Sequence, residues 1–178
     1  PRLVRLKNNS KSEIQDSLDL GAMGLILPNI QTEKELIKSI EYSRWPPYGI
    51  RGVGFSRANS FGKLFKNYQK FTNKIIIVAM IESIEAVNNL ETICKVKGLD
   101  AILIGPYDLS SSLNIPGKFD HKLYKSKLKK IKDICKKNNT TIGIHQVFPN
   151  YQILQKLKRD GFSFIPYGMD VTLLQNLK

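Results

Sequence analysis

Short apolar runs alternate with amphipathic stretches along almost the whole chain, and this alternation most constrains its fold. The apolar runs predict strands over residues 3–6, 23–27, 75–81, 101–104, 141–144 and 162–166. The stretches after them have apolar residues at helical spacing, which predicts helices over residues 10–20, 32–42, 84–94, 120–137, 151–159 and 171–177. Ser10, with Glu13 three residues later, indicates a capping box at the first helix. Strict alternation of strands and helices is typical of a parallel sheet with right-handed crossovers.

Two architectures have this alternation, a doubly wound sheet and a (β/α)8 barrel. No Gly-x-Gly-x-x-Gly pattern follows the first strand, which argues against the dinucleotide-binding form of the doubly wound sheet. The strands are short and evenly apolar, and polar residues gather just after them, which is typical of a TIM barrel. A complete barrel has eight βα units and about 250 residues. The 178 residues therefore predict an α/β fold, a single partial barrel domain over residues 1–178 with about the last six βα units and without the first two.

Composition places the chain among proteins with one substantial core. Apolar residues make up 42% of it, yet no apolar run approaches the roughly 20 residues that span a bilayer. The first residues resemble a strand and not a signal peptide. Cys94 and Cys135 each fall on an apolar helix face, at a spacing that suits neither a metal site nor a redox motif. We therefore expect reduced core cysteines in a cytoplasmic protein.

The net charge of +13 allows two interpretations, a nucleic-acid or membrane binder, or lysine-rich solvated helix faces. In residues 122–137 the lysines interleave with Leu123, Leu128, Ile131 and Ile134 at helical spacing, so they form the wet side of an amphipathic helix. No aromatic residues are interleaved there to stack on bases. We therefore expect neither a nucleic acid nor a membrane as a partner.

One long irregular stretch, residues 45–60, interrupts the alternation of strands and helices. Its prolines stiffen it, and its glycines allow the backbone to approach another group closely. Irregular segments of this length in compact domains are often functional. The stretch could equally be a rigid contact between subunits, and the sequence leaves both interpretations open.

Polar residues at the ends of the predicted strands are the candidates for chemistry. Arg5, Glu82, Asp108 and His145 each follow or close such a strand, and Glu82 and Asp108 leave consecutive ones. Two carboxylates held side by side repel each other unless a cation or a proton lies between them. A divalent ion with oxygen ligands suits this position, could bind the carboxylate and keto oxygens of a 2-oxo acid, and would stabilise its enolate. Arg5 would face the same charge with planar donors.

Each of these residues also has a structural interpretation. Glu82 could belong to the first turn of the following helix, where the helix dipole favours an acidic residue. Asp108 could cap the turn at residues 109–113, and Arg5 could form a structural ion pair. His145 is more simply a core histidine with satisfied hydrogen bonds, and His121 a surface residue.

Four segments resemble the HpcH/HpaI aldolases, the metal-dependent class II pyruvate aldolases. Residues 42–54 (YSRWPPYGIRGVG) are similar to the family's R-Y-P-P-x-G-x-R-G-V-G segment, and residues 104–110 (IGPYDLS) to its I-G-P-x-D-L-S segment. Residues 80–82 (MIE) stand where the family has Q-I-E, and residues 168–174 (GMDVTLL) match G-x-D-x-x-L-L. The resemblance runs from Leu3 almost to the end, with these segments in the family's order and spacing.

The resemblance implies a TIM barrel that binds Mg²⁺, Mn²⁺ or a similar ion such as Co²⁺. Glu82 and Asp108 fall on the metal-ligand positions. Arg5 falls on the arginine that binds the keto side of pyruvate and stabilises the enolate, and the pyruvate carboxylate is held by Gly105, Pro106, Tyr107 and Asp108. Asp19 falls on an acidic residue that helps to position the catalytic histidine, partly across subunits.

The activity that the resemblance implies is the reversible cleavage of a 4-hydroxy-2-oxo acid into pyruvate and an aldehyde. The segments around Tyr107 and His145 look like a branch that acts on sugar-derived or dicarboxylic 2-oxo acids. The family also forms homo-oligomers by exchanging the last helix between subunits.

Two departures from the family pattern concern catalysis. The family's catalytic histidine lies upstream of the residues in this chain, and neither His121 nor His145 takes its place. Met80 replaces the glutamine of Q-I-E and cannot donate a hydrogen bond. Two alternatives stay open beside the aldolase: a citryl- or malyl-thioester lyase of the same superfamily, and a non-catalytic remnant that binds metal and a 2-oxo acid.

Overall fold

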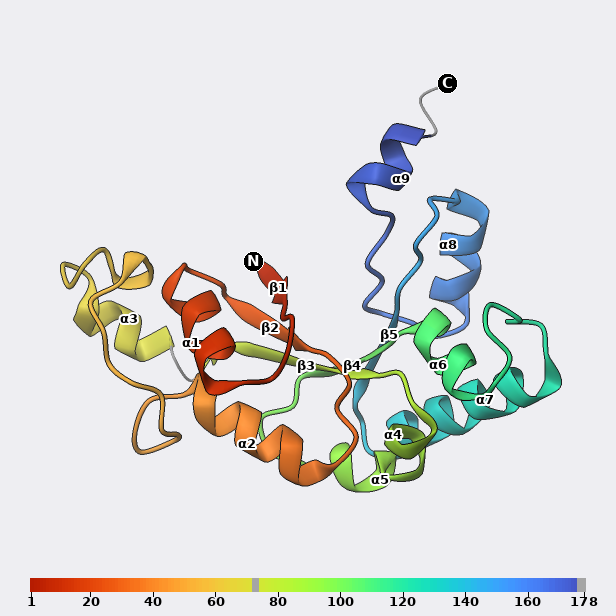
Figure 1. Cartoon of the computed structure of the whole chain (residues 1–178), viewed down its shortest axis with the longest axis horizontal. Coiled ribbons are helices and arrows are strands. Elements are labelled where there is room, and N and C mark those ends of the chain that lie inside the picture. The colour runs from red at the N-terminus through yellow and green to blue at the C-terminus, as the bar shows by residue number, and fades with distance from the viewer. Residues whose placement is uncertain (72–73, 176–178) are drawn as a thin grey trace.

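The computed structural model describes residues 1–71 and 74–175, and Figure 1 shows their arrangement. Five parallel strands form one sheet, in chain order: β1 (Leu3–Arg5), β2 (Gly24–Leu27), β3 (Ile76–Ile81), β4 (Ala101–Ile104) and β5 (Thr141–Ile144). The helices of the described residues are α1 (Lys11–Asp19), α2 (Glu33–Ser43), η1 (Arg57–Asn59), α3 (Phe65–Phe71), α4 (Ile84–Asn88), α5 (Leu90–Ile93), α6 (Pro106–Ser112), α7 (Lys122–Lys137), α8 (Tyr151–Arg159) and α9 (Asp170–Gln175). The parallel alternation predicted from the sequence is confirmed.

The two faces of the sheet carry different sets of apolar side chains. Side chains on the helix-covered face form the main core, and it includes Leu25, Ile77 and Ile102, none of which is exposed to solvent. The residues between them point to the opposite face, where Val78 and Leu103 belong to a second, smaller cluster. Because both faces are apolar, the strands are nearly continuous hydrophobic runs, as buried parallel strands usually are.

The helices α1, α2, α5 and α7 pack side by side along one face of the sheet, in chain order. The lysines of α7 face solvent as predicted, while Tyr124, Ile131 and Cys135 are buried against the core. The prediction that Leu123 is on the apolar face is wrong, because its side chain is 41% exposed. Cys94 packs against the same core, and both cysteines are free thiols.

Helix termini follow local side-chain chemistry, with two differences from expectation. Ser10 caps α1 by accepting from the Glu13 N–H, but the Glu13 carboxylate accepts from the Lys7 N–H, so the predicted reciprocal capping box is wrong. The helix predicted over residues 84–94 is two short helices that meet at Asn89, where the backbone leaves the helical region.

The predicted sixth strand is reduced to two isolated bridges. Phe164 pairs with Gly143 and Tyr167 pairs with Gln146, both in parallel orientation. The helix before this segment, α8, and the helix after it, α9, extend away from the sheet, as Figure 1 shows in blue. The final helix was predicted over residues 171–177, of which 176 and 177 lie outside the described residues.

The irregular stretch at residues 45–60 is anchored by the buried Arg51. Its guanidinium donates to the Asp19 carboxylate at 2.6 Å and to the Tyr68 hydroxyl at 3.1 Å, and it lies against the rings of Trp45 and Tyr68. The sequence pattern did not predict η1 and α3, which follow the anchor and complete its aromatic surroundings. In the parts of the chain that the structure describes, no helix has the length and apolarity needed to cross a bilayer.

Candidate functional site

The carboxyl ends of the strands bring three residues into one row. Met80, Leu103 and Gly143 are register partners on β3, β4 and β5. Two residues further along each strand, Glu82, Gly105 and His145 therefore occupy the same face of neighbouring chain segments, since side chains alternate along a strand. A Cβ placed on Gly105 would lie 2.7 Å from Glu82 Oε2, which confirms that these two residues are close neighbours.

Glu82 is 7% exposed and only partly satisfied. Its Oε1 accepts a hydrogen bond from the Asn29 N–H at 2.7 Å, whereas Oε2 is buried and has no partner among the described residues. Burial raises the pKa of the Glu82 carboxyl, and the nearby Asp108 carboxylate adds to this, while the Asn29 bond and the Arg5 charge act in the opposite direction. An orphaned carboxylate oxygen next to a second carboxylate is a place for a cation or a proton.

Asn29 orients this carboxylate and was missed by the sequence reasoning. It follows Pro28 at the end of β2 with a φ of 46°, a left-handed conformation that asparagine tolerates better than most residues. Its side-chain oxygen accepts from Gln31 Nε2 at 3.2 Å, and the Gln31 carbonyl accepts from Asn89 Nδ2 at 2.9 Å. An asparagine directly after a strand-ending proline was the available signal.

The structural interpretations of Glu82 and Asp108 do not hold. Glu82 precedes Ser83, and it is Ser83 that caps α4 by accepting from the Ala86 N–H. Asp108 lies in the first turn of α6 and is exposed, and within the described residues its carboxylate caps no backbone N–H. The Asp108 carboxylate raises the pKa of Glu82, which indicates that the two carboxyl groups are near each other.

Arg5 lies on the same face of the sheet as Glu82, two side-chain layers before it. It is register partner to Ile26 on β2, which in turn is partner to Val78, four residues before Glu82. Arg5 is exposed and forms no ion pair with any described residue, so the structural ion pair considered for it is not found. Its charge nevertheless lowers the pKa of Glu82, which indicates that the guanidinium is near the pair.

The segment 105–108 joins β4 to α6 beside the carboxylates. Pro106 is the first residue of α6, a position where a missing N–H is harmless. Tyr107 is 45% exposed, and its ring meets Phe119 edge to face at 5.1 Å. The segment thus presents backbone and an aromatic edge to the same rim as Asp108.

Asp19 is not part of this constellation within one chain. It ends α1, and because nine helical residues span roughly 13 Å, it lies towards the amino ends of the strands. There it is paired with Arg51. A role for Asp19 in positioning a catalytic group, as the resemblance implies, would therefore require the site of a second subunit. His121 is exposed, as expected, and caps α7 by accepting from the Leu123 N–H.

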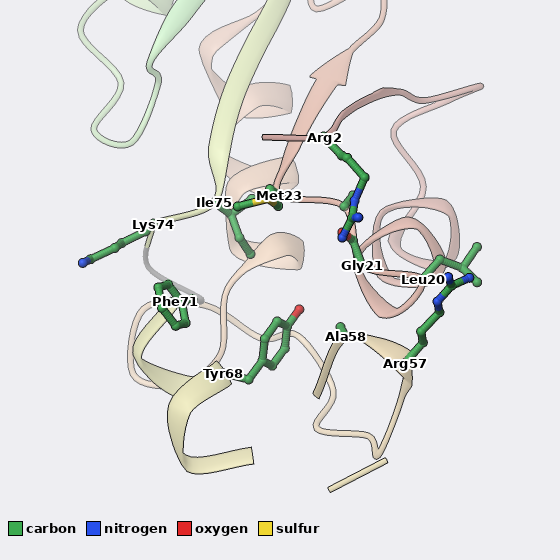
Figure 2. Close-up of a pocket in the computed structure, with 11 residues that line it drawn as sticks. Arg2, Leu20, Gly21, Met23, Arg57, Ala58, Tyr68, Phe71, Lys74 and Ile75 are labelled. Carbon is green, nitrogen blue, oxygen red and sulfur yellow. The ribbon is translucent and has the colours of Figure 1, made fainter. Parts of the chain in front are cut away.

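A cavity of about 480 Å³ lies at the amino-terminal ends of β1, β2 and β3, and it is separate from the carboxylate pair. Figure 2 shows the Tyr68 hydroxyl directed into it, between Gly21 and the side chains of Met23 and Ile75, which precede β2 and β3. None of its lining residues is acidic. The cavity lining therefore offers no carboxylate ligand for a hard cation.

The residues at the carboxyl edge fit a divalent ion. Glu82 Oε2 lacks a partner, Asp108 is nearby, and the absence of a side chain at Gly105 makes room for the Glu82 carboxylate. Within residues 1–71 and 74–175, no group of three or more His, Cys, Asp and Glu residues gathers as a metal site. The chain would thus supply two hard oxygen ligands, and further coordination positions would be open to substrate and water.

A parallel βα sheet with two facing carboxylates and an arginine at its carboxyl edge defines the class, a TIM-barrel-type fold with its polar site at the strand C-termini. The chain belongs to the HpcH/HpaI aldolase/citrate lyase family, whose sequence model matches residues 2–176. The resemblance seen in the sequence is thereby confirmed.

Three similar proteins illustrate the relationship. A 2-keto-3-deoxy-L-rhamnonate aldolase of Shigella dysenteriae is 32% identical over 96% of this chain and 64% of its own length. A 4-hydroxy-2-oxo-heptane-1,7-dioate aldolase of Shigella flexneri is 31% identical over 97% and 64%. The crystal structure of a family member from Burkholderia cenocepacia superposes with a TM-score of 0.91 at 26% identity, over 97% of this chain and 68% of that one. The chain thus spans a little under two thirds of the curated relatives it matches.

Proposed function

We propose that this protein is a metal-dependent aldolase that reversibly cleaves a 4-hydroxy-2-oxo acid into pyruvate and an aldehyde. The observation that carries the proposal is the buried, unpartnered Glu82 Oε2 beside Asp108, within the influence of Arg5. The aldolases named above, at 31% and 32% identity, support the reaction class. The proposed ion is Mg²⁺ or Mn²⁺, because both ligands are carboxylates.

In this proposal, each site residue has a distinct part. Glu82 and Asp108 hold the ion, which when bound supplies Lewis-acid stabilisation of negative charge on the keto oxygen. Arg5 donates to the same oxygen as the bond between C3 and C4 breaks, through a planar guanidinium that is pre-arranged for an oxygen anion. The backbone of residues 105–108 holds the carboxylate of the 2-oxo acid.

A second candidate function is binding of metal and 2-oxo acid without cleavage. It is favoured by the positions of the two histidines of the chain. His121 caps α7 at the surface, and His145 lies beyond Gly105, on the side away from Glu82. Neither is in the family's position for proton transfer, so cleavage would depend on a group from outside the described residues.

A titration with Mn²⁺, with and without pyruvate, tests both candidates. We expect Mn²⁺ to bind and pyruvate to tighten that binding, because the two share the Glu82 and Asp108 site. Release of pyruvate from a 4-hydroxy-2-oxo acid, abolished by a chelator, would then support the aldolase. Pyruvate binding without release of pyruvate from a 4-hydroxy-2-oxo acid supports the second candidate. Both candidates would be overturned if Mn²⁺ bound neither to the chain nor to a form extended to the length of its relatives.

We also propose that the protein is a cytoplasmic homo-oligomer. The free thiols of Cys94 and Cys135 support a reducing compartment. Support for an oligomer comes from the C-terminal helices, since α8 buries no residue and Leu173 and Leu174 of α9 are 48% and 66% exposed. Light scattering should report a multimer, and Leu173→Glu should shift it towards the monomer. A monomeric wild-type protein would contradict this proposal.

A further inference from the structure

His145 has a defined orientation at the end of β5. Its N–H donates to the Ile104 carbonyl of β4, while the next residue, Gln146, donates to the Pro166 carbonyl on the other side. This alternation of hydrogen bonds shows that the backbone stays extended beyond Ile144. The His145 side chain therefore points to the same face of the sheet as position 143. A Cβ at Gly143 would collide with Phe164, which packs against the second, smaller apolar cluster.

The strand end is held in place by the neighbour of His145 in the chain. Gln146 is buried, and its Nε2 donates to the carbonyls of Phe148 at 3.2 Å and Asn150 at 2.8 Å. His145 itself is half-buried, and within the described residues its imidazole forms no hydrogen bond or ion pair. The expectation of a satisfied core histidine is therefore wrong. A fixed backbone instead presents an unused donor and acceptor at the rim.

Gly105 lies between His145 and the carboxylate pair. Since neighbouring strands are about 4.8 Å apart, the His145 Cα lies roughly 5 Å from Gly105 and roughly 10 Å from Glu82. Gly105 has no side chain, so residue 105 places no side chain between Glu82 and His145, and the Glu82 carboxylate lies where a Cβ of residue 105 would be. A three-carbon acid whose keto oxygen lies towards Glu82 and Arg5 would extend its carboxylate over Gly105, towards the imidazole.

We propose that His145 is a substrate-binding residue whose imidazole N–H donates to the carboxylate of the 2-oxo acid. The inference rests on the proposed function, because it takes the 2-oxo acid to lie across Gly105. Glu82 and Asp108 repel that carboxylate from one side, so a donor on the other side would add to the binding that the backbone of residues 105–108 provides. Neutral imidazole suffices, since one ring nitrogen then carries a proton.

The test compares His145→Ala and His145→Asn with His121→Ala, by titrating each variant with Mn²⁺ and then, loaded with Mn²⁺, with pyruvate. A hydrogen bond to a charged group contributes about 1.5 kcal/mol or more, so His145→Ala should bind pyruvate at least about 10-fold more weakly. His145→Asn retains an N–H donor and should recover part of this loss. Mn²⁺ affinity without pyruvate should be unchanged in every variant, and His121→Ala should match the wild type throughout.

Wild-type pyruvate affinity in His145→Ala would overturn the inference. So would a loss of Mn²⁺ affinity equal to the loss of pyruvate affinity, because it would show that His145 only supports the fold of the site. If the wild-type chain binds Mn²⁺ but not pyruvate, the role of His145 is refuted while the metal site stands. If it binds neither, the proposed function fails, and this inference fails with it.

Discussion

Glu82 combines burial, an unpartnered oxygen and a neighbouring carboxylate at a single position. A carboxylate in such surroundings is destabilised unless a positive charge or a proton joins it. The cost is not offset within the described residues, where Asn29 satisfies just one oxygen. Residues held in this state cluster at functional sites, which is why we place the metal here.

Removing either carboxylate should weaken metal binding strongly. Glu82→Gln and Asp108→Asn each remove one of the two proposed metal ligands. Mutating a residue that only hydrogen-bonds to a metal ligand typically costs about 10–100-fold in metal affinity. We therefore expect each variant to bind Mn²⁺ at least about 100-fold more weakly. Calorimetric titration measures it. Glu85→Gln, on the exposed first turn of α4, is the matched control and should leave affinity unchanged. Full affinity in Glu82→Gln or in Asp108→Asn would refute the shared site.

The conformation of Asn29 should be coupled to metal affinity. Alanine is strained at a φ of 46°, by about 1–2 kcal/mol, so Asn29→Ala should shift the backbone N–H away from Glu82 and weaken Mn²⁺ binding several-fold. Glycine adopts this φ freely, so Asn29→Gly should keep most of the affinity. Equal affinities in the two variants would mean that this hydrogen bond does not orient the carboxylate.

At the level of elements, the irregular segment and α3 depend on one buried cation. Arg51 ties the segment to the end of α1 through Asp19, and it lies against two aromatic rings. Sequence periodicity does not predict such an anchor, because the partners of Arg51 are Trp45, Tyr68 and Asp19, which are 6, 17 and 32 residues away in the sequence. The element pattern could therefore be predicted only where local spacing carries it.

Arg51→Ala should destabilise the fold substantially. The change removes the buried partner of a salt bridge and leaves a hole between Trp45 and Tyr68, which together should lower the free energy of unfolding by about 3 kcal/mol. Urea denaturation followed by tryptophan fluorescence reports it, since Trp45 is the one tryptophan of the chain. Arg57→Ala changes an exposed arginine of the same segment and should have little effect. A small effect of Arg51→Ala would show that the anchor is dispensable.

Tyr124 of α7 should make stability depend on alkaline pH. Burial raises the pKa of its phenol from 10 to about 12. The folded state thus holds the phenolic proton more tightly than the unfolded state, so this contribution is complete below pH 10 and is lost as pH rises through about 12. Tyr124→Phe should therefore lose less stability than the wild type between pH 9 and about 11, as measured by urea denaturation. Parallel losses would indicate that the phenol is accessible.

At the scale of the whole molecule, the chain superposes on the family member from Burkholderia cenocepacia with a TM-score of 0.91. Among the described residues, β1 pairs with a strand on one side only. At the other edge of the sheet, the segment of Phe164 and Tyr167 pairs through two isolated bridges. Strand edges of this kind pair readily with further chain segments. The exposed apolar side chains of α8 and α9 likewise indicate surfaces that another subunit would cover.

The sequence alone determined the βα alternation, the positions of five strands and the identity of Arg5, Glu82 and Asp108 as strand-end residues, because apolar periodicity and side-chain chemistry are local properties. It did not determine that Glu82 Oε2 is left without a partner, that Asn29 holds Oε1, or that Asp19 lies at the far end of α1. Register, curvature and burial arise from contacts between segments far apart in the sequence. Only the tertiary structure could therefore place His145 across Gly105 from the carboxylate pair.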